Sequence, residues 1–295
     1  MEANVKMLKS GLTEPRALAR KSGVILMLVS ALVFSTAGLF TKGVTADAWA
    51  VIFWRGLFAA LFTFFYIQWN DKIRHEFLCM GKPGWAIAFL GAAGTAAFIP
   101  AFKLTSIANV SLIYAIAPFV SACVAWMWFR ERPTLPVMVA SLVALLGVLL
   151  IVSGSLGNIN LGGDFLALWM TLMMSLVMVI YRRYPQTPAA GPAVMASLFL
   201  LPFGFYYGDP LSSPIIEIVI MAAFGLIFAL ASVTLQEGAR RLPPAEAALI
   251  SAAETPLAPI WAWMLFSEVP PIFTIAGGAV VLLAVFGSQV INLKR

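Results

Sequence analysis

Two ionisable side chains, Arg55 and Glu254, lie within long apolar stretches of the sequence. A charge in apolar surroundings is costly, so such a group normally faces a cavity or an opposite charge. The two residues could form a buried pair that fixes helix packing. They could instead offer both charges to a zwitterion, or Glu254 could carry a proton. For Glu254, the packing role and the functional roles (binding a zwitterion or carrying a proton) both stay open. A packing role is favoured for Arg55, because its long side chain can reach the end of its apolar stretch.

Small polar residues recur at helical spacing in these stretches. Ser111, Tyr114, Pro118 and Ser121 follow one another at intervals of three and four residues, so they share one helix face. Such a stripe lines a path or bonds to a neighbouring helix, and we predict that it lines a cavity. Trp261 continues the face of Glu254 and would stack on a ligand or join an interfacial aromatic belt. The predicted binding residues are Glu254, Arg55, Ser111, Tyr114, Ser121, Ser251, Thr255 and Trp261.

Prolines interrupt the same apolar stretches at Pro118, Pro256 and Pro259. A proline frees a backbone carbonyl, which at membrane depth is tolerated where the backbone lines a cavity or is buried in protein. We therefore predict hinges at these three positions, with simple helix bending as the alternative.

Patterns typical of catalysis or cofactor binding are missing from the sequence. The single histidine, His75, lies in a connector, and Cys79 and Cys123 have no motif spacing. The sequence has no metal-ligand cluster, nucleophile elbow or phosphate loop. It therefore predicts neither an enzyme nor a bound cofactor or metal. The net charge of +6 lies in short connectors, so nucleic acid is not a predicted partner either.

Long apolar helices must position these residues. Of the 295 residues, 61% are hydrophobic and 11% are charged, against roughly 45–50% and about 25% in soluble domains. A helix needs about 20 apolar residues to cross the hydrocarbon core of a membrane. We predict an all-α membrane protein with ten transmembrane helices, at residues 24–40, 48–67, 85–102, 106–129, 135–152, 165–181, 193–206, 215–235, 245–266 and 272–291.

The positive charges predict how these helices are oriented. With the N-terminus inside, sixteen of the 19 Lys and Arg residues fall on the inner side, while Lys42 and Lys103 fall on the outer side. The positive-inside rule then makes both termini cytoplasmic, with residues 1–22 as a retained cytoplasmic tail. In this arrangement Arg55 lies about 10 Å and Glu254 about 18 Å from the external end, at about 1.5 Å per residue.

The two halves of the sequence match each other at a shift of 137 residues. The spacing Trp-Met-x-Phe-x-Glu at residues 126–131 recurs at residues 263–268. Each copy holds five predicted helices, an odd number, so the second copy must enter the membrane from the opposite side. Inverted repeats of this kind are common in secondary transporters, where the substrate site lies near the midplane between them.

The sequence resembles two EamA domains. The stretch from Ser106 to Gly154 has a mid-helix proline, an aromatic-rich exit, a glutamate at the turn and a glycine-containing apolar helix, and Ala245 to Ile291 is similar. The triplets Phe53-Trp54-Arg55 and Glu254-Thr255-Pro256 are also similar to sequences common in that group. The resemblance implies the drug/metabolite transporter superfamily, with ten helices in two inverted five-helix repeats, a central cavity, alternating access and no nucleotide hydrolysis. The implied domains are a tail at 1–22 and EamA repeats at 23–154 and 163–292.

The resemblance implies a membrane transporter but names neither a substrate nor a direction. We predict secondary active export of amino acids or related compounds across the plasma (bacterial inner) membrane, with protons as a candidate coupling ion. Uptake of a vitamin or nucleoside-like metabolite is the near alternative, and a membrane enzyme acting on lipid-linked substrates is a further one. The predicted partners are a small-molecule substrate and the lipid bilayer, and the oligomeric state stays open.

Overall fold

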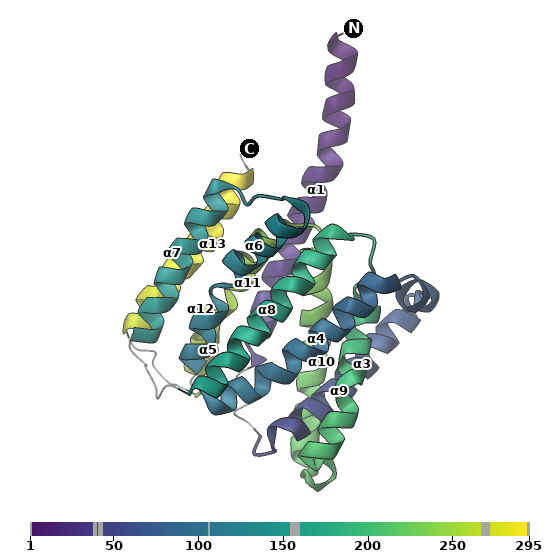
Figure 1. Ribbon diagram of the computed structural model, residues 1–295, viewed down its shortest axis with the longest axis vertical. Coiled ribbons are helices and arrows are strands. Elements are labelled where there is room, and N and C mark those ends of the chain that lie inside the picture. The colour runs from purple at the N-terminus through teal and green to yellow at the C-terminus, as the bar shows by residue number, and fades with distance from the viewer. Residues whose placement is uncertain are drawn as a thin grey trace.

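The computed structural model describes residues 2–37, 40, 44–105, 107–153, 160–266 and 272–293, and within these ranges the chain is helical with no strand. The helices form one bundle, and both ends of the chain lie at the same end of it (Figure 1). Many large apolar side chains on the outside are exposed, as expected of a surface that faces lipid. Within the described ranges, seven helical stretches are long and apolar enough to span a membrane: Ala48–Trp69, Gly81–Ala101, Leu112–Phe129, Leu161–Arg183, Ala190–Gly208, Ile215–Ala239 and Ile272–Ile291. The stretch Leu112–Phe129 includes a short interruption that is described below.

Helix α1 runs from Glu2 to Phe34, so the predicted tail and the first apolar stretch form one continuous helix. Its N-terminal part projects beyond the bundle (Figure 1). The helix ends before the predicted Phe40, because the hydroxyls of Ser35 and Thr36 donate back to carbonyls three residues earlier, at 2.6 and 2.7 Å. Such local bonds compete with the helical backbone pattern.

The next helices are α3 (Ala48–Trp69) and α4 (Gly81–Leu104), joined by the short π-helix η1 (Arg74–Leu78). Asp47 starts α3 by accepting a hydrogen bond from the backbone N–H of Trp49 at 2.9 Å.

Two predicted continuous spans are each divided into two helices. The fourth consists of α5 (Ile107–Tyr114) and α6 (Ala117–Phe129), and the ninth of α11 (Pro244–Ser251) and α12 (Glu254–Phe266). Every one of these eight boundaries has its counterpart 137 residues away. At each break the backbone forms a tighter turn: Ile116 N–H donates to Ile113, and its counterpart Ala253 donates to Ile250. The internal repeat inferred from sequence is therefore present down to the position of the breaks.

The second half of the chain contributes α8 (Leu161–Arg183), α9 (Ala190–Gly208) and α10 (Ile215–Ala239), with the short helix η2 (Pro210–Ser212) between the last two. Helix α9 begins three residues before the predicted seventh span. Glu76, from η1, explains this earlier start, because its carboxylate accepts hydrogen bonds from the backbone N–H groups of Ala190 and Gly191 at 3.0 and 2.9 Å.

Helices α7 (Leu135–Ser153) and α13 (Ile272–Leu293) lie side by side (Figure 1). A side-chain carbon placed on Gly147 would meet the Gly277 carbonyl and Val281, and one placed on Gly277 would meet Gly147 and Ile151. Contacts later along α7 thus meet residues earlier along α13, so the two helices are antiparallel. Helices α3 and α9 pack in the same way, since Gly208 approaches Trp49 and Gly204 approaches Phe53.

Candidate functional site

The breaks in the two divided helices lie close together inside the bundle. We call this region, residues 114–117 and 251–254, the junction. Tyr114 is the last residue of α5 and Ser251 is the last residue of α11. The side chains of Tyr114 and Ser251 lie close together, and Glu254 lies near Tyr114. The Tyr114 and Ser251 hydroxyls do not form a hydrogen bond with each other. The buried Ser251 Oγ has no hydrogen-bond partner in the described part of the chain. A buried hydroxyl of this kind is costly unless something else bonds to it.

Glu254 opens the second half of the ninth span as the first residue of α12. Its side chain is half-buried, and no contact within the described residues gives its carboxylate a hydrogen bond or an ion pair. A carboxylate in the first turn of a helix is stabilised by the positive end of the helix dipole. Glu254 is therefore held at the junction as an available acceptor.

The prolines lie just after the breaks. Pro118 falls within the first turn of α6 and Pro256 within the first turn of α12, and both are buried. Proline is tolerated at the start of a helix because its missing N–H would have had no partner there. Pro256 also packs against α13, where a side-chain carbon on Gly278 would lie 3.0 Å from its Cβ. At both places a short turn with tighter backbone hydrogen bonds separates two helical segments of one span.

The other predicted polar residues of the junction differ in availability. Ser121 is fully buried, and its hydroxyl donates to the Pro118 carbonyl at 3.1 Å, so it is occupied within its own helix. Thr255 is half-buried beside Glu254. Ser111 belongs to α5 and Pro259 to α12, but the side chains of both lie outside the described residues.

Trp261 lies two turns beyond Glu254 on the same helix. Its indole N–H donates to the Ser35 hydroxyl at 2.8 Å, immediately after the end of α1. The face of α12 that carries Glu254 and Trp261 is thus directed toward the end of α1. The bond explains how Trp261 is fixed, and its ring remains half-buried beside the junction.

Arg55 is 2% exposed and reaches from α3 toward α10. Its guanidinium lies 4.1 Å from the ring centre of Phe228 and 5.4 Å from that of Phe224. Burying an ion costs several kcal/mol, and a desolvated cation–π contact returns about 2 kcal/mol. The two rings therefore offset only part of the burial cost.

Arg55 and Glu254 do not pair. Among the residues that the structure describes, the ion pairs leave out both side chains, and Arg55 Nε has no hydrogen-bond partner. The structure therefore does not join these two charges as a buried ion pair. Each charge is held separately and is open to other partners.

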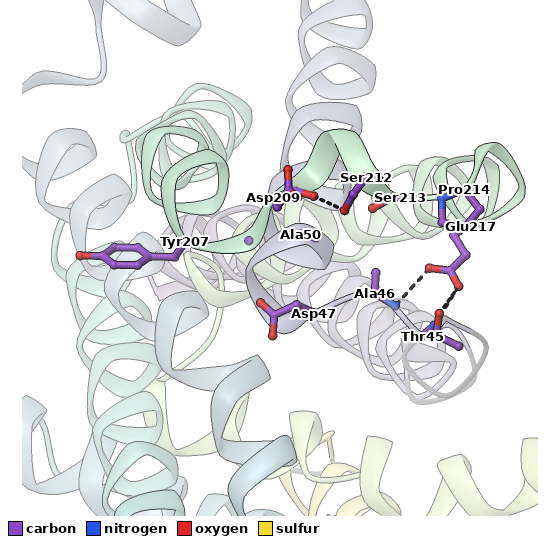
Figure 2. Close-up of a pocket in the computed structure, with 11 residues that line it drawn as sticks. Thr45, Ala46, Asp47, Ala50, Tyr207, Asp209, Ser212, Ser213, Pro214 and Glu217 are labelled. Atoms are coloured by element: carbon purple, nitrogen blue, oxygen red, sulfur yellow. Dashed lines mark hydrogen bonds between the residues drawn. The ribbon is translucent and has the colours of Figure 1, made fainter.

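A cavity of about 420 Å³ lies at the end of the bundle opposite the termini (Figures 1 and 2). It is lined by the start of α3, the turn between α9 and α10, and the segment before α3. Glu217 fixes one wall: its carboxylate accepts hydrogen bonds from the Thr45 N–H at 3.0 Å, the Thr45 hydroxyl at 2.6 Å and the Ala46 N–H at 3.1 Å. Figure 2 shows Tyr207 pointing away from these groups. We define the bonds between Glu217 and residues 45–46 as the loop clamp.

Sequence reasoning missed two features. One is the contact of Arg55 with the rings of Phe224 and Phe228, which we call the aromatic cage, and the other is the loop clamp. Phe224 and Phe228 are four residues apart and so share one face of α10, a spacing that the sequence displays. Their contact with Arg55 joins distant parts of the chain, and no local pattern predicts it. Glu217 is likewise separated by 172 residues from the threonine that it holds.

The comparisons with known proteins agree with this architecture. A family model described as the EamA-like transporter family matches residues 21–153 and 161–289. A crystal structure described only as that of a protein has a TM-score of 0.80 with this chain at 14% sequence identity, covering 92% of this chain and 98% of its own, and shows likeness of fold alone. No curated protein matches the chain. Since the family match spans both halves, the chain belongs to the EamA-like transporter family, integral membrane proteins that move small molecules.

Proposed function

We propose that the protein is a secondary active transporter of small metabolites that works by alternating access. One observation carries the proposal: two helices are interrupted at repeat-equivalent positions, and the interruptions lie close together at Tyr114 and Ser251. Irregular backbone at membrane depth is tolerated where it lines a cavity or is buried in protein. In secondary transporters, broken helices of this kind form the substrate site.

The proposed architecture is ten transmembrane helices in two inverted five-helix repeats. Each divided pair counts as one span, and the apolar part of α1 and the shorter helix α7 are added to the long spans. The antiparallel packing of α7 with α13, and of α3 with α9, supports inversion because each pair consists of equivalent helices. We place the repeats at 23–154 and 163–292, following the tail at 1–22.

The junction offers binding groups of both signs. Helices α5 and α11 end there and present the negative ends of their dipoles, whereas α6 and α12 begin there and present positive ends. Glu254 adds a carboxylate. This combination suits a zwitterion, and we propose export of amino acids or related compounds. Glu254 is the proposed proton carrier, and the breaks before Pro118 and Pro256 are the proposed hinges.

We place both termini in the cytoplasm and the protein in the plasma (bacterial inner) membrane. Arginines gather at the ends of helices on the side of the termini, as the positive-inside rule requires of a cytoplasmic face. Arg182 pairs there with Glu131 at 2.9 Å, and Arg240 pairs with Glu237 at 2.6 Å. Arg20 pairs with Glu246 at 2.5 Å and so joins α1 to the start of α11.

The proposal is tested by competitive flux of a pooled metabolite library in proteoliposomes, with and without a pH gradient. The wild type is compared with Glu254→Ala. Saturable movement of one compound class that depends on Glu254 is the expected result. Absence of flux under every gradient, from protein shown to be folded, would contradict transport and favour an enzyme acting on lipid-linked substrates.

A further inference from the structure

Arg55 differs from the four arginines that form ion pairs with glutamates. Arg20, Arg182, Arg240 and Arg241 each contact a glutamate carboxylate at 2.5–2.9 Å, and all lie near the end of the bundle that holds the termini. Arg55 lies within a span and faces two phenylalanine rings. Within the described residues, no carboxylate contacts it. A purely structural arginine would be expected to follow the pattern of the other four.

The aromatic cage fixes the guanidinium and keeps water from it. Phe228, the nearer ring, packs edge-on against Phe34 with ring centres 5.6 Å apart, and Phe224 stacks on Phe40 at 5.4 Å. The cage is thus built from α10 and from the end of the first span. A cation held in so apolar a site interacts strongly with any anion that reaches it.

The cage is connected to the proposed substrate site through the end of α1. Phe34 is the last residue of α1, and the next residue, Ser35, accepts the hydrogen bond from Trp261. Trp261 in turn shares a face of α12 with Glu254. The Phe228–Phe34 contact and the Trp261–Ser35 hydrogen bond thus link the cage of Arg55 to the helix that begins with Glu254.

We infer that the Arg55 guanidinium binds the carboxylate of the transported compound, so that the substrates are amino acids or other organic acids, and amines that lack a carboxylate are rejected. The planar fork of arginine donates two parallel N–H bonds to a carboxylate. A singly charged carboxylate also balances the single charge of Arg55. The inference rests on the proposed transport function and assigns its substrate class.

The test uses compounds that share one carbon skeleton: L-phenylalanine, 3-phenylpropionate and phenethylamine, with a second set built on L-leucine. Binding to purified protein is measured by thermal stabilisation, and flux is measured in proteoliposomes. We expect the carboxylate-bearing compounds of at least one set to bind more than tenfold tighter than the matching amine. In Arg55→Gln this preference should disappear.

Three further variants separate recognition from folding. Arg182→Gln is the matched control, because it removes an arginine that already has a carboxylate partner; it should lower the melting temperature and leave the carboxylate preference intact. Arg55→Lys keeps the charge without the fork and should retain only part of the preference. Phe228→Leu keeps Arg55 and removes the nearer ring, so the preference can still be measured if Arg55→Gln does not fold. Phe228→Leu should weaken the binding of the carboxylate-bearing compounds several-fold.

The outcomes distinguish this inference from the transport proposal. Flux of amines or neutral compounds without a carboxylate preference would leave transport standing and overturn the role of Arg55. A carboxylate preference that survives in Arg55→Gln would also overturn it. Absence of flux of every compound, with folded protein, would count against the transport function itself.

Discussion

Tyr114 and Ser251 occupy equivalent positions in the two repeats, 137 residues apart, and their side chains lie close together where the two helices are interrupted. Residues related by a two-fold repeat can face each other only close to the axis that relates the repeats. In the inverted-repeat arrangement proposed above, the axis would therefore pass near these two side chains. One residue is a tyrosine and the other is a serine. The backbone of the junction therefore follows the repeat, whereas the side chains at these two equivalent positions differ.

Removing the Ser251 hydroxyl should separate stability from transport. Its Oγ is buried without a partner in the described part of the chain, so Ser251→Ala should change the free energy of unfolding by less than about 1 kcal/mol. If the hydroxyl bonds to substrate, the half-saturating substrate concentration should rise about tenfold, an energy near 1.4 kcal/mol. Ser141→Ala is the control, because the Ser141 hydroxyl already donates to Val137 within α7. Equal transport by wild type and Ser251→Ala would remove Ser251 from the site.

Glu254→Gln should abolish the response of flux to a pH gradient. In proton-coupled export the substrate accumulates on the acidic side, because protons move the other way through the carboxylate. A glutamine is permanently neutral, so the variant should still exchange substrate across the membrane but should not accumulate it. Counterflow and gradient-driven uptake in proteoliposomes measure the two activities. Glu237→Gln, at the end of the bundle that holds the termini, should keep the pH response, and an unchanged response in Glu254→Gln would rule out the proton-carrier role.

Gly277→Ala should destabilise the contact between α7 and α13. The added carbon would lie 2.4 Å from the Gly147 carbonyl oxygen, and overpacking of this kind costs about 1–3 kcal/mol. Gly287→Ala on the same helix is the matched control, since an added carbon there meets nothing within 4 Å in the described structure. Thermal denaturation in detergent should show a lower midpoint for the first variant alone. Equal midpoints would mean that the helices separate easily.

Glu217→Gln should release the loop clamp. The carboxylate accepts three hydrogen bonds from Thr45 and Ala46, and an amide, with a single oxygen acceptor, cannot reproduce them all. Hydrogen exchange at the Thr45 and Ala46 amides should become faster. Asp209→Asn, at an exposed position on the same cavity, should leave their exchange unchanged. Slow exchange in Glu217→Gln would show that other contacts hold this loop.

The sequence predicted the helical class and the repeat well, because both depend on patterns that can be read along the chain without knowledge of the fold. Apolar length marks a span, and a shift of 137 residues aligns Trp126 with Trp263 whatever the fold. The same shift also relates the breaks before Ala117 and Glu254. Their form was less predictable. The prolines suggested kinks, whereas the chain stops one helix and starts another.

The site was only partly predictable, since its contacts join residues far apart in sequence. Glu254 and Ser251 stood out because polar groups are rare in apolar stretches. The cage of Arg55 did not, because Phe224 and Phe228 look like ordinary apolar residues of α10 until the fold brings α3 against them. The depths of Arg55 and Glu254 could not decide whether the two charges pair. Depth gives position along the membrane normal and no information about position around the bundle.

The glycine crossing of α7 and α13 limits how the protein can change shape. The Gly147 and Gly277 backbones are in direct contact. These two helices therefore form one closely packed pair, with one helix from each repeat. In the alternating access proposed above, the movement that exposes the junction first to one face of the membrane and then to the other would keep this contact closed. In that mechanism the remaining helices would move relative to α7 and α13, and the junction would open on the side of the bundle away from this pair.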